Sequence, residues 1–227
     1  MSVFRPNASA LITGGASGIG LAVAQLCLRH DMKVTIVDFN QTTLDFAVQN
    51  LEKEVKGEVH CVKADVGDKE AWKKLREEGE GEEAIVVTGS KQGITNPPGN
   101  AAYNASKAAV KALTEHLSYD LREKKNIGVH LLVPGWTFTG LSGNVPGTDK
   151  QKPDGAWSPE QVADYMYKKM QDGKFYIICP DNDVSEETDK KRMLWSVGDI
   201  VNERPPLTRW RPEFKEEAEE WMSKCKV

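Results

Sequence analysis

A glycine-rich segment near the N-terminus constrains the fold of this 227-residue chain more than any other feature. It reads Thr-Gly-Gly-Ala-Ser-Gly-Ile-Gly over residues 13–20. An apolar run typical of a buried strand precedes it at 8–13, and a stretch of helical period follows it at 18–30. Because a strand, a glycine turn and a helix occur in this order, the segment predicts a nucleotide site rather than a plain turn.

Strand-length apolar runs and helical stretches alternate through the rest of the chain. Further strands are expected at 33–38, 58–63, 84–88, 128–133 and 174–179, and further helices at 41–55, 69–78, 101–123, 159–172 and 212–224. This alternation is typical of βαβ units, so the fold class is α/β with a parallel sheet. We expect a single domain over residues 1–227, with a charged C-terminal tail at 180–227.

The glycine turn supplies most of the predicted cofactor contacts. Gly14 lets the chain turn tightly, Gly18 lets the backbone approach a pyrophosphate, and Gly20 lets the helix pack on the strand. The helix start also offers unpaired N–H groups and a favourable dipole to a phosphate, which adds Ser17 and Ile19 to the candidates.

Carboxylates at the ends of two strands extend the predicted site. Asp38 ends the second strand, where it can accept hydrogen bonds from both ribose hydroxyls of an adenosine. Its charge would repel a 2′-phosphate, so NAD is favoured over NADP; the alternative is a solvated carboxylate. Asp65 and Val66 follow the third strand and are candidates for the adenine pocket, although a turn aspartate would look the same.

Three residues further along form a catalytic constellation. Tyr103 and Lys107 are four positions apart at the start of a long helix, which places them on one face. The ammonium of Lys107 stabilises a phenolate, which makes Tyr103 a competent general acid/base. Ser90 follows the strand at 84–88 and could hydrogen-bond a substrate oxygen. Taken alone, such a Tyr-Lys pair is common on solvated helix faces.

The glycine motif, the Tyr-x-x-x-Lys pair and a serine thirteen positions before the tyrosine together resemble the short-chain dehydrogenase/reductase family. The segment from Pro134 and Gly135 to Thr139 also resembles the family's Pro-Gly segment, where the nicotinamide carboxamide binds; the side chain of Thr139 and the backbone of Thr137 match.

The resemblance implies a Rossmann-like, doubly wound fold and a role for each catalytic residue. Tyr103 would exchange the hydroxyl proton of the substrate, and Ser90 would orient the carbonyl. Lys107, with Tyr103, would also contact the cofactor by holding the nicotinamide ribose. The cofactor supplies the hydride, while the protein supplies orientation and proton transfer.

The interval between Asp65 and Ser90 departs from the family pattern. The family places two helices and two strands there, which need roughly 45 positions, whereas only 24 residues are present. One central strand and one helix are therefore expected to be absent. We expect the strand at 84–88 to pair beside the one at 8–13, because an empty position would leave ladder hydrogen bonds unmade. The absent helix forms half of the usual dimer surface, so homo-oligomerisation stays open.

The leading hypothesis is an NAD(H)-dependent oxidoreductase that interconverts a secondary alcohol and a ketone. A redox-silent cyclase or isomerase using the same Tyr-Lys pair is one alternative, and a catalytically impaired NAD-binding pseudoenzyme is another. The loop at 136–157 would face the substrate. Its apolar side chains indicate a bulky apolar substrate or ordinary core; they are Trp136, Phe138, Leu141 and Trp157.

Composition and charge indicate which binding partners and which cellular compartment to expect. The net charge of −4 is spread along the chain without a basic cluster, so no nucleic-acid partner is expected. No segment reaches membrane-spanning length, and the four cysteines show no CxxC spacing, so we expect a reducing cytoplasm and no metal site. The acidic stretches at 183–189 and 213–220 are interpreted as solvated helix faces, with a partner site as the minority interpretation. Tail composition is similar to that of some fungal family members, which implies secondary metabolism.

Overall fold

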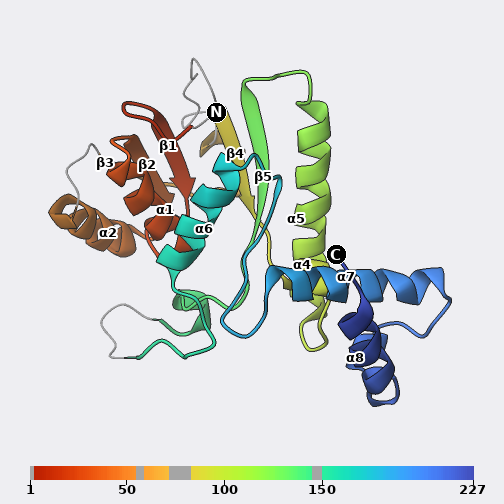
Figure 1. Cartoon of the computed structure of the whole chain (residues 1–227). Helices are drawn as coiled ribbons and strands as arrows, with labels where there is room; N and C mark the ends of the chain where they lie inside the picture. The colour runs from red at the N-terminus through yellow and green to blue at the C-terminus, as the bar shows by residue number, and fades with distance from the viewer. Residues whose placement is uncertain (1–2, 55–58, 72–82, 145–149) are drawn as a thin grey trace. The chain divides into compact units, whose positions relative to one another are not determined.

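The computed structural model describes residues 3–54, 59–71, 83–144 and 150–227. The chain is an α/β protein that divides into two compact units (Figure 1). The first unit contains Met1–Ala84, Asn126–Gly128 and Thr137–Lys174, and the second contains Ile85–Lys125, Val129–Trp136 and Phe175–Val227.

The first unit is built on a three-stranded sheet in the order β1-β2-β3, with both ladders parallel. Its strands are β1 (Ser9–Thr13), β2 (Lys33–Asp38) and β3 (Val59–Lys63), and its helices are α1 (Gly18–Arg29), α2 (Gln41–Glu54) and α6 (Pro159–Gln171), with a 3-10 turn η1 (Gly140–Ser142). Apolar side chains of β2 and the two helices after β1 and β2 form the core, in which Val34, Leu44 and Leu51 are fully buried. Burial of such side chains is the main stabilising force of this unit.

Helix α6 packs against α1 in the same unit. Arg29 at the end of α1 lies 3.6 Å from the Asp164 carboxylate, and the ring of Tyr167 contacts those of His30 and Phe4. The start of α6 is fixed by a capping box between Ser158 and Gln161, with Pro159 at the first helical position.

The second unit carries the other three-stranded sheet, in the order β4-β5-β6. Its elements are β4 (Glu83–Thr88), β5 (Ile127–Val133), β6 (Tyr176–Ile178), α4 (Gln92–Thr95), α5 (Ala101–Asp120), α7 (Glu186–Val201), α8 (Lys215–Lys224) and the turns η2 (Thr208–Trp210) and η3 (Pro212–Phe214). Leu131, Val133 and Ile178 form the centre of a core that side chains from α4, α5 and α7 complete.

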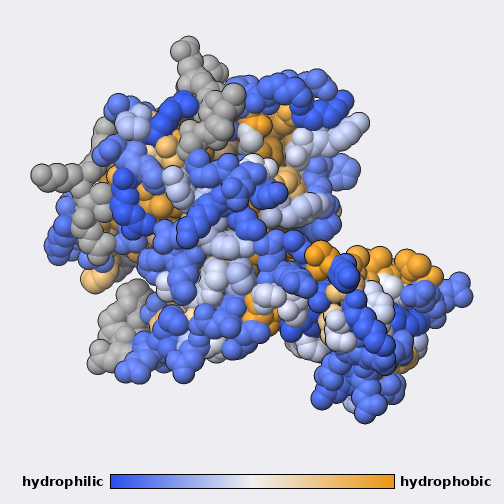
Figure 2. Space-filling model, in the orientation of Figure 1, coloured by the Kyte–Doolittle hydropathy of each residue, from blue (hydrophilic) through white to orange (hydrophobic). Residues whose placement is uncertain are grey.

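The C-terminal tail packs around Trp195 of α7. The indole is 2% exposed and donates a hydrogen bond from Nε1 to Thr208 Oγ1, while the Arg204 guanidinium stacks on it and pairs with Asp199. Helix α7 also exposes an apolar stripe, visible in Figure 2, that contains Leu194, Val197, Ile200 and Val201.

The predicted pairing of the strand at 84–88 with the first strand stays a prediction, because the two strands belong to different units. β4 forms where the sequence predicts it, in the sheet with β5 and β6, and β1 pairs with β2 in the sheet of the first unit.

Most of the interval that prompted this prediction is not described. The expected helix at 69–78 lies largely outside the described residues, as does part of the loop at 136–157. The absence of a strand and a helix relative to the family therefore stays a prediction. Among the helices that the structure describes, none is both long and apolar enough to cross a membrane.

Candidate active site

The predicted site residues fall into two sets, one in each unit. The cofactor-binding candidates from the glycine turn, the strand ends and the Thr137–Thr139 segment lie in the first unit. Ser90, Tyr103, Lys107, Pro134 and Gly135 lie in the second unit.

The glycine turn in the first unit has the close approaches that its sequence predicts. Gly14 and Gly18 have φ angles of +64° and +53°, in the left-handed region that favours glycine. A Cβ atom on Gly20 would lie 2.2 Å from the Gly14 carbonyl oxygen, so the helix start and the turn touch backbone to backbone. A Cβ on Gly14 would meet nothing within 4 Å, so that side of the turn is open.

The start of α1 is suited to an anion. Ser17 is its N-cap residue, and the Ser17 side chain makes no capping hydrogen bond. The first N–H groups of a helix have no partner within it, and their dipole favours negative charge. Backbone groups at Gly18 and Ile19, with the Ser17 hydroxyl, could therefore hold a pyrophosphate, and the open side of the turn gives it room.

Thr139 lies against this turn. Its Cγ2 atom is 3.1 Å from the position that a Cβ on Gly18 would take. Thr139 caps η1 by a reciprocal hydrogen-bond pair with Ser142, which holds its side chain in place. The Thr137 carbonyl already accepts hydrogen bonds from Thr139 N and Ser142 Oγ, so Thr139 is the better candidate for a cofactor contact.

Asp38 and Asp65 stand at the carboxyl edge of the first sheet, where ligands bind in open α/β sheets. One oxygen of Asp38 accepts a hydrogen bond of 3.2 Å from the Asn40 N–H, and its Oδ2 has no partner among the described residues. Asp65 Oδ1 accepts from the Gly67 N–H, which is the turn role that its sequence left open, and Val66 is 47% exposed beside it.

Tyr103 and Lys107 share one face of α5 in the second unit. The Lys107 Nζ atom is 5.8 Å from the centroid of the Tyr103 ring and donates a hydrogen bond to the Thr88 carbonyl at the end of β4. The Asn100 side chain caps α5 by accepting from the Tyr103 N–H. The pair is therefore fixed at the carboxyl end of β4.

Ser90 lies between the end of β4 and the short helix α4, whose N-cap residue is Lys91. Its Oγ atom accepts a hydrogen bond of 3.2 Å from the Gln92 N–H, so its hydroxyl proton stays available for a substrate oxygen. A Cβ on Gly93 would lie 2.6 Å from the Lys107 backbone, so α4 and α5 are in backbone contact there. The structure thus brings the Ser90 turn beside the start of α5.

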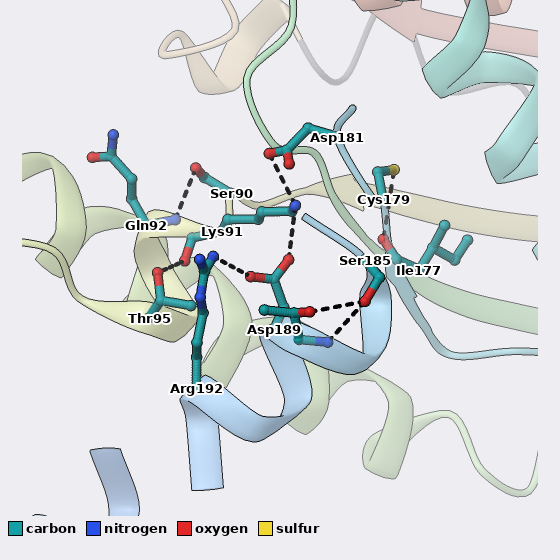
Figure 3. Close-up of polar contacts among 11 residues, drawn as sticks. Ser90, Lys91, Gln92, Thr95, Ile177, Cys179, Asp181, Ser185, Asp189 and Arg192 are labelled. Atoms are coloured by element: carbon teal, nitrogen blue, oxygen red, sulfur yellow. Dashed lines mark hydrogen bonds and ion pairs between the residues drawn. The ribbon is translucent and has the colours of Figure 1, made fainter. Parts of the chain in front are cut away.

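A buried ion cluster in the same region was missed by sequence reasoning. The side chain of Lys91 is held between Asp181 and Asp189, at 3.1 and 2.7 Å (Figure 3). Asp189 is fully buried, so the prediction that it lies on a solvated helix face is wrong. It is buried because its carboxylate neutralises the charges of Lys91 and Arg192. The signal that could have located the cluster was the lysine next to Ser90.

The other tail residues behave differently. Glu186 and Glu187 form pairs with lysines one turn along α7, and the Glu187 side chain is 60% exposed, as expected of a solvated helix face.

Comparison with known proteins places the chain in a family. The model of the family described as short chain dehydrogenase matches residues 8–80 and 78–150. Among curated proteins, the "Uncharacterized oxidoreductase YbbO" of Escherichia coli is 41% identical over 73 residues, which are 32% of this chain and 27% of that protein. The "7beta-hydroxysteroid dehydrogenase" of Mediterraneibacter gnavus is 32% identical over 90 residues, 38% of this chain and 34% of that protein.

Solved structures agree with the fold. A short chain dehydrogenase/reductase from Burkholderia phymatum in complex with NAD has a TM-score of 0.73 at 22% identity, covering 91% of this chain and 98% of that one. A short-chain dehydrogenase from Sphingobium yanoikuyae in complex with NADPH has a TM-score of 0.65 at 19% identity, covering 90% and 99%. The chain belongs to the short-chain dehydrogenase/reductase family.

Proposed function

We propose that this chain is an NAD(H)-dependent oxidoreductase that interconverts a secondary alcohol and a ketone. The single observation that carries the proposal is the Tyr103–Lys107 pair at the carboxyl end of β4, in a chain of this family. When bound, the nicotinamide supplies or accepts the hydride, and the protein supplies orientation and a proton.

Each residue of the pair has a role in the proton transfer. The Tyr103 hydroxyl donates a proton to the carbonyl oxygen during reduction and removes it during oxidation. The Lys107 ammonium stabilises the phenolate form of Tyr103 and would hold the nicotinamide ribose. The Ser90 hydroxyl donates a hydrogen bond to the substrate oxygen, which orients the carbonyl for hydride transfer.

The cofactor is proposed to be NAD rather than NADP. Asp38 leaves one carboxylate oxygen for a ribose hydroxyl, and its charge disfavours a 2′-phosphate. Pyrophosphate contacts come from the α1 start and Gly14, and the carboxamide contact from Thr139, Thr137 and the Pro134-Gly135 turn. Solved neighbours hold NAD in one case and NADPH in another, so the preference rests on Asp38.

The substrate is proposed to be bulky and apolar. Trp136 is 51% exposed and Leu141 is 87% exposed, so both can contact a ligand, whereas Phe138 is buried and belongs to the core. A steroid dehydrogenase among the relatives is consistent with such a substrate. The matched stretches span 27% and 34% of the two relatives described above, so the activity is a proposal for this chain. The single domain over residues 1–227, the cytoplasmic location and the role in secondary metabolism stay predictions.

The proposal is tested by turnover and binding of Tyr103→Phe beside the matched variant Tyr119→Phe. Tyr119 is on the same helix, is 64% exposed and stacks with Arg122 away from the pair. We expect Tyr103→Phe to lower kcat for a ketone panel by about 10²-fold or more, with NADH binding by fluorescence unchanged, and Tyr119→Phe to match the wild type.

Other outcomes of this experiment identify the alternatives. Turnover that needs no nicotinamide would indicate the redox-silent isomerase or cyclase. NADH binding without any turnover in the wild type would indicate the pseudoenzyme, for which the short interval between Asp65 and Ser90 supplies the motive. Equal activity of Tyr103→Phe and the wild type would overturn the proposed mechanism.

A further inference from the structure

The residue that follows Ser90 holds an unusual position for a lysine. Lys91 is 9% exposed, and its Nζ atom lies 3.1 Å from Asp181 Oδ2 and 2.7 Å from Asp189 Oδ2. Asp189 is 0% exposed, and its other oxygen accepts a hydrogen bond of 3.1 Å from Arg192. Burial of these charges carries a large desolvation penalty, which the ion pairs offset only in a well-defined geometry.

The backbone of Lys91 is fixed as firmly as its side chain. Its N–H donates to the Pro134 carbonyl, and its own carbonyl accepts from the N–H and the hydroxyl of Thr95. The next N–H, of Gln92, donates to Ser90 Oγ. Because Ser90 and Lys91 share one peptide unit at the start of α4, the orientation of the Ser90 hydroxyl depends on where Lys91 is held (Figure 3).

The ion cluster also packs on the Pro-Gly turn after β5. A Cβ atom on Gly135 would lie 2.6 Å from Asp181 Oδ2 and 3.1 Å from Lys91 Nζ. Glycine at 135 therefore lets the backbone touch the ion pair directly. The Ser90 turn, the Pro134-Gly135 turn and the first turn of α7 meet at a single ammonium.

We propose that Lys91 is a positioning residue for the reaction: Asp181 and Asp189, which come from the C-terminal segment, hold Lys91 so that Ser90 points its hydroxyl at the substrate carbonyl. The inference rests on the proposed function, because it assigns Lys91 an action through Ser90. By this inference the segment after β6, which the sequence analysis describes only as a charged tail, contributes to catalysis. An apolar side chain could fill the same space, but only a charged one selects a single arrangement of two carboxylates.

The test is a double-mutant cycle between Ser90→Ala and Lys91→Met, with kcat and KM measured for one ketone and NADH binding measured by fluorescence. We expect Lys91→Met to lower kcat by about 10- to 100-fold with NADH affinity nearly unchanged. In the Ser90→Ala background the same change should cost almost nothing more, because the two residues act as one unit. Lys91→Arg, which keeps the charge, should recover most of the activity.

The matched control is Lys111→Met, which breaks a half-exposed pair with Glu115 on α5 and should leave turnover unchanged. If Lys91→Met does not fold, Asp181→Asn, at the more exposed edge of the cluster, replaces it in the same cycle with a smaller drop expected. Equal losses in the wild-type and Ser90→Ala backgrounds, or unchanged kcat, would overturn the inference while Tyr103→Phe still reports on the proposed function. A wild type without nicotinamide-dependent turnover would overturn both.

Discussion

The glycine turn and the Ser90 turn are both places where a strand leads into a helix, but they are held by different forces. At the glycine turn the contacts are local: Gly20 touches Gly14, and Gly15 donates to Val37 one strand away. At the Ser90 turn the fixing groups come from far along the chain, since Lys91 is held by Asp181 and Asp189. The first turn depends on the absence of side chains, and the second depends on buried charge.

The largest expected effect is on the charge-held turn. Asp189→Ala removes the buried carboxylate that Lys91 and Arg192 share, and loss of one partner of a buried ion pair costs about 3–5 kcal/mol of unfolding free energy. Urea unfolding measures this loss. Glu187→Ala on the same helix, where the side chain is 60% exposed, should leave the midpoint almost unchanged. Equal losses of unfolding free energy in the two variants would contradict the claim that buried charge holds the Ser90 turn.

A methyl group is expected to disrupt the glycine-held turn. Gly20→Ala would place Cβ 2.2 Å from the Gly14 carbonyl oxygen, and such overpacking costs about 3 kcal/mol. NADH binding should be lost with it, since the turn must move. The matched change Gly140→Ala meets nothing within 4 Å and should alter neither thermal stability nor binding. A wild-type affinity in Gly20→Ala would contradict this account of the turn.

Cofactor choice is expected to depend on one carboxylate beside the glycine turn. Asp38→Ser removes a charged acceptor, so NADH affinity should fall by about tenfold while NADPH affinity rises. Fluorescence titration of both cofactors measures the two changes. Tighter binding of NADPH than NADH by the wild type would show that Asp38 is only a solvated strand end.

The smallest expected effect concerns Tyr176 in β6, which precedes Asp181 in the chain. Burial, and a hydrogen bond to Glu115, raise the pKa of Tyr176 to about 12. Burial opposes the shift of Glu115, but hydrogen bonds from Lys111 and Tyr176 lower the pKa of Glu115. The Tyr176 contribution is therefore present below the unfolded tyrosine pKa of about 10 and is lost as pH rises through about 12.

Absorbance titration of tyrosinate distinguishes the two states of this group. Wild type should show one late-titrating tyrosine that Tyr176→Phe lacks, and the variant should be less stable than the wild type at neutral pH but not at the alkaline end. A titration curve without a late component would contradict the contact.

The sequence predicted those parts of the fold and site that local patterns determine. Strand β2 lies where the spacing of apolar residues predicts it, and helices α1, α5 and α6 begin at the residues that the sequence predicts. Burial of charge depends on contacts between distant residues, so the environment of Asp189 could not be predicted from the chain alone.

The central claim is that the chain transfers hydride between NADH and a ketone with Tyr103 as the proton donor. Transfer of deuterium from labelled NADH to the alcohol product tests this claim most directly. With both hydrogens at C4 of the reduced nicotinamide replaced by deuterium, a ketone substrate and wild-type protein, mass spectrometry should find deuterium on the carbinol carbon of the alcohol product, and Tyr103→Phe should slow its appearance by about 10²-fold. Product without deuterium, or deuterated product formed equally fast by Tyr103→Phe, would contradict the account.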